Sequence, residues 1–222
     1  MNKVEIFEND RATGYNQFVE TWIPNYRYFI DNLPKLLCDT ENKNLLVVGC
    51  GTGNEIERFV HAAEQWKITG IDPSPEMIKQ AVQKFNNNGK VNLVEGLITD
   101  LDRSGRYGAA TLLLVLHFME DNGAKFSLLQ NIAERLETGA PLILLDITGS
   151  STQIKENLEI LKLLLPGTLG KADIKNRLHR IENELHAVSE ERLSQLCIEA
   201  GFEAPLRFFQ TSIYMGWITR RK

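Results

Sequence analysis

The stretch "NLLVVGCGTGNE", residues 44–55, decides the fold because an apolar run breaks there into three glycines within five positions. A run that is apolar without alternation is typical of a strand buried on both faces of a parallel sheet. Glycine, which has no Cβ, lets the chain turn sharply and lets a ligand approach the main chain. Open α/β sheets bind ligands at such loops, at the carboxyl ends of their strands. The stretch therefore predicts a strand, a ligand-binding turn and a following helix; a tight turn without a ligand is the alternative.

An acid at the end of the next predicted strand favours a nucleotide as the ligand. In "ITGIDPSPEMIKQA", residues 68–81, Asp72 lies 21 positions after Gly51. In nucleotide-binding βαβ units, an acid about 20 residues after the glycines accepts hydrogen bonds from ribose hydroxyls. The dinucleotide fingerprint G-x-G-x-x-G would need a glycine at Asn54, whereas the extra glycine here is Gly53. A pyrophosphate therefore fits poorly, and a dinucleotide-dependent oxidoreductase is a less favoured hypothesis.

Short apolar runs alternate with helical patterns through the middle of the chain. We expect strands at 44–49, 67–71, 91–95, 110–116 and 141–147, and helices at 54–64, 75–85 and 124–137. Strands that are apolar on both faces and alternate with helices imply a parallel sheet covered on both sides.

Helical segments flank this alternation. Residues 15–38 are rich in aromatic residues, and Pro24 is expected to open a second helix there. Residues 150–188 form an insert in which Ile174, Leu178, Ile181 and Leu185 make one helical stripe. Ser189 is expected to cap the next helix, which ends at Gly201. Residues 206–219 are expected to form two strands of an antiparallel hairpin at the sheet edge.

Composition limits the class of protein. The chain has 222 residues, 43% of them apolar, and a formal charge of -4, so we expect one domain, no nucleic-acid partner and no membrane partner. The N-terminus carries acids where a signal peptide would need an apolar stretch. Cys38, Cys50 and Cys197 are scattered with no CxxC, which predicts neither a disulfide framework nor a metal site. A reducing cytoplasm is the expected location.

The glycine pattern G-x-G-x-G before a helix resembles the first motif of the class I S-adenosylmethionine-dependent methyltransferases. The stretches "GIDPSPEMI", "VEGLITDL", "LLLVLHFMED" and "ERLETGAPLILLD" resemble this superfamily's later motifs. The resemblance implies a Rossmann-like, doubly wound seven-stranded sheet, mostly parallel, with an antiparallel last strand. It also implies one methyltransferase domain with a helical N-terminal lid (1–43), a cofactor-binding core (44–149), a helical insert after strand five (150–188), and a last helix with a C-terminal hairpin (189–222).

The same resemblance assigns a cofactor, S-adenosylmethionine, with S-adenosylhomocysteine as product. Asp72 would hold the ribose, Met77 would pack near adenine, and Tyr26 would reach the methionine end. The third motif commonly has an acid after its glycine, but here Leu97 follows Gly96. Recognition of adenine would therefore depend on the backbone of Leu97 and Ile98 and on apolar stacking. The full set of implied cofactor-binding residues is Tyr26, Gly49, Cys50, Gly51, Gly53, Asp72, Pro73, Met77, Leu97, Ile98 and Leu113.

Catalysis and acceptor binding are predicted less directly. The donor already carries an activated methyl group, so alignment of a nucleophile is the main task, with a general base for an acidic hydroxyl or an amine. His117 follows the fourth strand and is the candidate base; in the superfamily a histidine here often only lines the pocket. Tyr15, Trp22, Arg177 and Arg180 are expected to belong to a lid over the acceptor.

Two stretches, "WIPNYRYFIDNL" and "RFFQTSIYMGWI", resemble the carboxy-S-adenosylmethionine synthases, which act in tRNA wobble uridine modification, and small-molecule methyltransferases near them. The synthases have an asparagine on strand four where this chain has Leu113, and Arg177 and Arg180 are out of register with the synthases' arginine. Methyl transfer to an O, N or S atom of a small molecule is therefore the favoured function. The synthase activity and a non-catalytic cofactor-binding protein remain alternatives, and a homodimer is compatible with the sequence.

Overall fold

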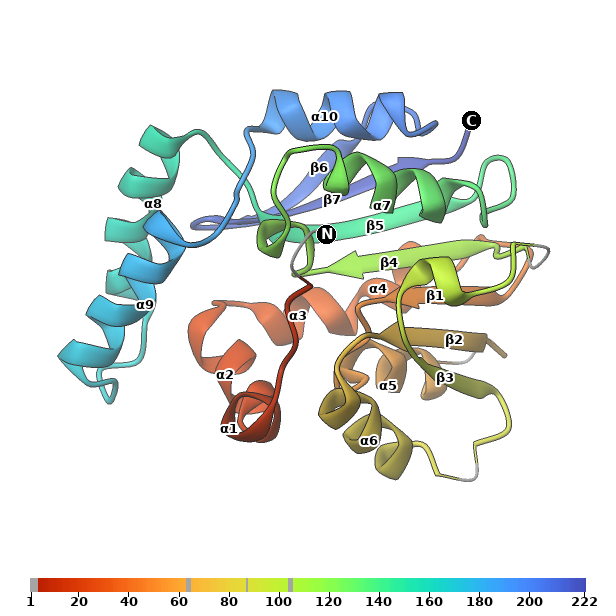
Figure 1. Ribbon diagram of the computed structural model, residues 1–222, viewed down its shortest axis with the longest axis horizontal. Coiled ribbons are helices and arrows are strands. Elements are labelled where there is room, and N and C mark those ends of the chain that lie inside the picture. The colour runs from red at the N-terminus through yellow and green to blue at the C-terminus, as the bar shows by residue number, and fades with distance from the viewer. Residues whose placement is uncertain (1–3, 63–64, 87, 104–105) are drawn as a thin grey trace.

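A seven-stranded sheet in the order β3-β2-β1-β4-β5-β7-β6 forms the centre of the molecule (Figure 1). The computed structural model describes residues 4–62, 65–86, 88–103 and 106–222. The strands are β1 (Asn44–Val48), β2 (Lys67–Asp72), β3 (Val91–Glu95), β4 (Ala109–Leu113), β5 (Pro141–Ile147), β6 (Leu206–Thr211) and β7 (Tyr214–Arg220). The first five pair in parallel, and β7 runs antiparallel to both of its neighbours, β5 and β6. This is the predicted sheet, with a Rossmann-like arrangement and a reversed last strand.

Helices cover both faces of the sheet because its central strands are apolar on both sides. Along β1, Leu45 and Val47 enter one hydrophobic cluster, and Leu46 and Val48 enter the other. The first cluster includes residues of α3 (Tyr26–Asp31), α5 (Asn54–Val60) and α6 (Pro75–Lys84), and the short α4 (Leu33–Leu36) packs on α5. The second includes residues of α7 (Ala124–Ala133) and α10 (Glu190–Glu199). The two-sided burial thus matches the unbroken apolar runs of the sequence.

Four further helices lie toward the side to which the parallel strands point, on the left of Figure 1. They are α1 (Asn9–Thr13), α2 (Tyr15–Trp22), α8 (Ser151–Leu164) and α9 (Lys171–Asn183). The N-terminal segment and the insert after β5 therefore meet near the carboxyl edge of the sheet, where open α/β folds place their ligand sites. Among the described residues, no helix combines the length and apolar character that a membrane crossing needs.

Several predicted boundaries need correction. The fourth strand ends at Leu113 instead of residue 116; Leu114 then takes a left-handed φ of 60°, and a short 3₁₀ helix, η2, covers Leu116–Phe118. The reason is tertiary: the Asp146 carboxylate, at the end of β5, accepts the backbone N–H groups of Val115 and Leu116. An apolar run alone cannot reveal that distant acceptor.

The helix predictions need smaller changes. The second N-terminal helix begins at Tyr26, not at Pro24, because Asn25 is left-handed at φ 61°. The helices expected to reach residues 85 and 137 end at Lys84 and Ala133, and α5 ends at Val60; residue 64, its predicted end, lies outside the described residues. In the insert, Leu185 lies beyond the end of α9, and α8 precedes it as a separate helix. The Ser189 cap is confirmed by its bond from the Arg192 N–H, and Gly201 follows α10 at φ 97°.

Candidate functional site

The glycine turn leaves β1 through three left-handed residues. Gly49, Gly51 and Gly53 have φ values of 70°, 51° and 78°, a region that side chains with a Cβ rarely adopt. The N–H groups of Gly49 and Cys50 donate to the Ile71 carbonyl at 2.8 and 3.0 Å, which ties the turn to the end of β2. A Cβ on Gly53 would lie 2.4 Å from the Phe85 ring. The turn therefore needs glycine for its own geometry and also presents bare backbone at the sheet edge.

Asp72 joins the glycine turn to the next loop. It ends β2 and is 8% exposed. One carboxylate oxygen accepts the Gly51 N–H at 3.0 Å, and the other accepts the Ser74 N–H at 2.8 Å. Burial raises the pKa of Asp72, and these two N–H groups oppose that rise. A carboxylate has about four lone-pair sites, so its two oxygens retain acceptor capacity for hydroxyl groups.

A second buried acid, Glu55, lies in the first turn of α5 and was missed by the sequence analysis. Its side chain is 4% exposed. Burial raises the pKa of Glu55 to about 7, and the nearby charge of Asp72 adds to the rise. In the turn itself, burial also raises the pKa of the Cys50 thiol, which makes Cys50 a packing residue and not a thiolate. The sequence feature that could have identified Glu55 is its position: it is an acid close after the glycines, at the start of a predicted helix.

The N-terminal segment crosses over this turn. The Phe7 N–H donates to the Ser74 hydroxyl at 3.1 Å. The Tyr15 ring lies 3.7 Å from the position that a Cβ on Gly51 would occupy. The Phe7 ring packs edge-on against the rings of Tyr15 and Phe118, with both centroid distances 5.6 Å. Tyr15 therefore lies between the glycine turn and the space beyond it.

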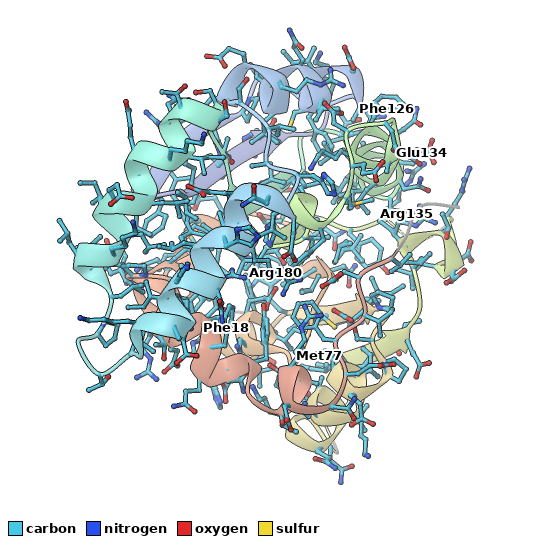
Figure 2. The ribbon with its side chains drawn as sticks, turned by 60° about the vertical axis from the view of Figure 1, so that its left-hand side comes forward. Phe18, Met77, Phe126, Glu134, Arg135 and Arg180 are labelled. Atoms are coloured by element: carbon cyan, nitrogen blue, oxygen red, sulfur yellow. The ribbon has the colours of Figure 1, made fainter. Side chains whose placement is uncertain are left out.

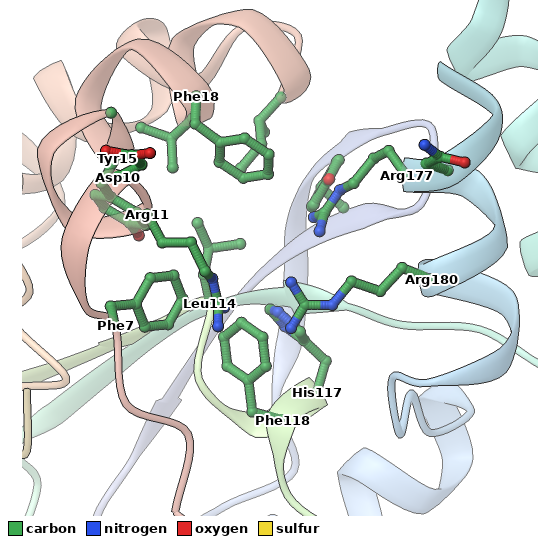
Figure 3. A pocket seen from close by; sticks show the side chains of 15 residues that line it. Phe7, Asp10, Arg11, Tyr15, Phe18, Leu114, His117, Phe118, Arg177 and Arg180 are labelled. Carbon is green, nitrogen blue, oxygen red and sulfur yellow. The ribbon is translucent and has the colours of Figure 1, made fainter. Parts of the chain in front are cut away.

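That space is a cavity of about 510 Å³ between the N-terminal segment, the loop after β4 and helix α9. Figure 3 shows Arg177 and Arg180 reaching from α9 toward the segment that carries Phe7 and Arg11. Figure 2 shows Arg180 and Phe18 on these two facing elements. The lining residues are Phe7, Asp10, Arg11, Gly14, Tyr15, Phe18, Val19, Ile23, Leu114, His117, Phe118, Asn176, Arg177, Arg180 and Tyr214. The cavity is mostly apolar, with arginines from both the N-terminal segment and α9.

His117 lines the cavity and is held by Asp146. Its Nδ1 lies 2.7 Å from an Asp146 carboxylate oxygen, and both side chains are almost fully buried. Because a carboxylate only accepts hydrogen bonds, we assign the proton to Nδ1, which leaves Nε2 as the basic nitrogen. The same carboxylate also accepts the N–H groups of Val115, Leu116, His117 and Ile147. Asp146 thus fixes both the loop and the orientation of the imidazole.

The predicted site residues fall into two groups and a remainder. Four line the cavity: Tyr15, His117, Arg177 and Arg180. Around the glycine turn and the loops after β2 and β3 lie Gly49, Cys50, Gly51, Gly53, Asp72, Pro73, Met77, Leu97 and Ile98. Met77 and Ile98 are buried, whereas Leu97 is 43% exposed. Met77 belongs to α6, which lies beside α1 (Figure 2).

The remaining three predicted residues belong to neither of these groups. Trp22 packs into the core near Phe18, with ring centroids 6.1 Å apart. Leu113 is buried in the same core, and its neighbour Leu114 lines the cavity instead. Tyr26 is buried on α3, and its hydroxyl interacts with Asn54. Leu114, the residue of this loop that lines the cavity, has a left-handed conformation.

Several cavity residues carried no local signal. Phe7 and Arg11, Phe118, and Tyr214 come from three separate segments, and only the tertiary fold brings them together. Asp146 had a weaker signal as the acid that ends the fifth strand, in the position equivalent to Asp72 on the second.

Comparison with known proteins gives the family of the central part. Residues 46–142 match the sequence profile of a family described as "Methyltransferase domain". No curated protein matches the sequence significantly.

Solved structures share the fold at low sequence identity. Human N-acetylserotonin methyltransferase, in complex with S-adenosylmethionine, is 18% identical in sequence and superposes with a TM-score of 0.66. The match covers 95% of this chain and 55% of the human chain. The plantazolicin methyltransferase BpumL, with a triazolic desmethylPZN analog and S-adenosylhomocysteine, is 15% identical with a TM-score of 0.67, covering 97% and 92%. The N-methyltransferase NodS from Bradyrhizobium japonicum, with S-adenosylhomocysteine, is 16% identical with a TM-score of 0.61, covering 89% and 88%.

The chain spans little more than half the length of the human enzyme and about nine tenths of the other two. The profile match covers the glycine turn, Asp72 and the loop that carries His117, and the shared fold extends over nearly the whole chain. Residues 46–142 thus match a methyltransferase domain, and the chain as a whole shares the fold of solved methyltransferases.

Proposed function

We propose that this protein transfers a methyl group from S-adenosylmethionine to an O, N or S atom of a small-molecule acceptor. The observation that carries the proposal is the placement of the glycine turn and Asp72 next to a largely apolar cavity lined by His117, which Asp146 orients. The size of that cavity, about 510 Å³, is in the usual range for small-molecule sites. Structures of this fold have been solved with S-adenosylmethionine or S-adenosylhomocysteine bound.

The residues around the turn suit this donor. The bare backbone of Gly49–Gly53 would accept the amino-acid end, and the Asp72 carboxylate would accept the ribose hydroxyls. Pro73, Met77, Leu97 and Ile98 would surround the adenine. We further propose that Cys50 packs beneath the turn, that Tyr26 supports it through Asn54 and that Leu113 supports the cavity floor. The donor supplies a methyl group on a sulfonium, so the protein needs only to align and deprotonate the acceptor.

His117 would act as the general base. Asp146 keeps the Nδ1 proton in place and stabilises the imidazolium that forms when Nε2 takes a proton from the acceptor. The surrounding Phe118 and Leu114 side chains exclude water from that side of the cavity. The N-terminal lid, with Tyr15 and Trp22, and the insert, with Arg177 and Arg180, would close the site from opposite sides.

Calorimetric titration with S-adenosylhomocysteine tests the donor site. Wild-type protein should bind it, and Asp72→Asn should weaken binding about tenfold to a hundredfold, because a charge-assisted hydrogen bond to the ribose is lost. Asp39→Asn, an exposed acid, is the matched control and should bind like wild type. If the wild-type chain binds neither the donor nor S-adenosylhomocysteine, the proposal fails.

Two other activities stay open at the same site. A carboxy-S-adenosylmethionine synthase would copurify with a carboxylated cofactor, which mass spectrometry of the bound nucleoside would identify. A non-catalytic binding protein would hold the cofactor tightly but produce no S-adenosylhomocysteine with a broad panel of acceptors. We also infer a cytoplasmic location from the three unpaired cysteines.

A further inference from the structure

We propose that the acceptor carries an anionic group, a carboxylate on a flat apolar body, and that Arg177 and Tyr214 bind it. This inference rests on the proposed function, since it names the class of acceptor for the same cavity. Three guanidinium groups line that cavity, from Arg11, Arg177 and Arg180. Two of them already pair with carboxylates of the protein: Glu5 bonds to Arg11 at 2.7 Å and to Arg180 at 2.8 Å through the same oxygen, and Glu184 lies 3.6 Å from Arg180.

Arg177 differs from the other two arginines. Within the described part of the chain, no carboxylate pairs with it. Its guanidinium lies 4.7 Å from the centroid of the Phe18 ring, which holds the group in one place by a cation–π contact. Its Nε atom is buried and has no hydrogen-bond partner in the described structure. A buried donor without a partner costs free energy, so binding of a ligand that accepts a hydrogen bond from this Nε–H would be favoured.

Tyr214 supplies a second donor beside Arg177. The residue begins β7, is 1% exposed and lines the cavity. Burial raises the pKa of its hydroxyl, and the Arg177 guanidinium lies close enough to oppose that rise. Nevertheless, no hydrogen bond of normal geometry satisfies the hydroxyl oxygen within the described residues. The Tyr214 hydroxyl proton and the Arg177 Nε–H, neither of which has an acceptor in the described structure, together offer two donors to an anion.

The chemistry of the walls indicates the rest of the ligand. Phe7, Phe18 and Phe118 present ring faces and edges to the cavity, and aromatic walls favour a flat apolar body. Arg177 can offer Nε and one terminal N–H side by side, which matches the two oxygens of a carboxylate. Because Glu5 leaves this arginine unpaired, the subsite remains positive in a chain whose formal charge is -4.

Binding of benzoate and of benzamide, its neutral analogue, tests this subsite in the full chain. With S-adenosylhomocysteine present, we expect benzoate to bind at least about tenfold more tightly than benzamide, since the charged acceptor gains charge-assisted bonds. Arg177→Gln should remove that preference, and Tyr214→Phe should reduce it. Lys175→Gln, an exposed residue on the same helix, removes the same charge and should leave both affinities unchanged.

The outcomes separate this inference from the proposed function. Equal affinity of the wild type for benzoate and benzamide, or an unchanged preference in Arg177→Gln, would overturn the anion subsite while S-adenosylhomocysteine binding still supported the donor site. If Arg177→Gln weakens S-adenosylhomocysteine binding and leaves the benzoate preference intact, the arginine binds the donor's carboxylate and the acceptor assignment is wrong. Unchanged S-adenosylhomocysteine affinity in both variants, with the preference lost, is the expected result and also shows that the variants fold.

Discussion

Two buried acids, Asp146 and Glu55, differ in the hydrogen-bond donors around their carboxylates. Asp146 is 3% exposed and accepts bonds from four backbone N–H groups and the His117 ring. These bonds fix the orientation of the carboxylate and of the imidazole. Glu55 is almost as buried, yet burial dominates and raises its pKa to about 7. Asp146 can therefore orient a base, whereas Glu55 makes stability depend on pH.

Glu55→Gln should stabilise the protein at alkaline pH. The pKa of about 7 in the folded state lies above that of the unfolded chain, so the folded state holds the proton more tightly. The free energy of unfolding of the wild type should therefore fall as pH rises from about 4.5 to 7, by at most about 1.4 kcal/mol per pH unit. The glutamine variant lacks this loss.

Urea denaturation at pH 5 and pH 8 measures the difference. The advantage of the variant over wild type should be larger at pH 8. Glu41→Gln, which removes one charge from the exposed surface, gives the effect of net charge alone. An advantage of Glu55→Gln that is the same at both pH values would show that Glu55 is not buried in protonated form.

His117→Asn separates a catalytic role from a bracing role. The asparagine amide can still donate to Asp146 but offers no basic nitrogen to the acceptor. With any acceptor that turns over, kcat should fall about 10²- to 10⁴-fold, the usual contribution of a general base. Affinity for S-adenosylhomocysteine, measured by calorimetry, should not change. A variant with wild-type kcat would assign His117 to the cavity wall only.

At the scale of elements, two segments that are far apart in sequence contribute walls of the cavity. The Glu5 carboxylate links the N-terminal segment to α9, because it forms ion pairs with Arg11 of α1 and with Arg180 of α9. Burial disfavours ionisation of Glu5, but its bonds to the two arginines outweigh that effect and lower the pKa. The three side chains are all partly exposed, so the contact contributes at most about 1 kcal/mol to stability. A closure of this strength can open to admit ligands.

Glu5→Gln should loosen the N-terminal segment without unfolding the sheet. Amide hydrogen exchange in residues 4–13 should become faster, while exchange in β1 and β5 should remain at the wild-type rate, because those strands lie in the core. Glu8→Gln is the matched control, since it lies in the same segment and its side chain makes no capping bond. Equal exchange in Glu5→Gln and wild type would mean that the aromatic packing of Phe7 holds the segment alone.

At the scale of the whole molecule, donor binding should link to unfolding, because the glycine turn and Asp72 exist as a site only in the folded chain. S-adenosylhomocysteine at 100 times its Kd should raise the free energy of unfolding by about 2.7 kcal/mol. A thermal melt should therefore shift upward with this ligand, and NAD at the same concentration should give no shift. A shift with NAD alone would favour the dinucleotide reading of the glycine turn.

Much of the core was predictable because its information is local. An apolar run, three glycines and an acid 21 positions later define two strands and a turn, since backbone conformation and two-sided burial act on neighbouring residues. The hairpin 206–219 and the Ser189 cap were predictable for the same reason. The early end of β4 was not, since the acceptor that turns the chain there is the distant Asp146.

Local sequence was enough to predict the parallel sheet and the glycine turn with Asp72, because each depends on spacing along the chain. Which side chains meet at the cavity depends on the tertiary structure: Leu114 lies in its wall, Asp146 bonds to His117, and Arg177 lies beside Tyr214 while Glu5 pairs with other arginines. The physical reason is that pairing of charges and burial of polar atoms depend on distances between segments. Those distances are set only when the N-terminal segment and the insert fold against the edge of the sheet.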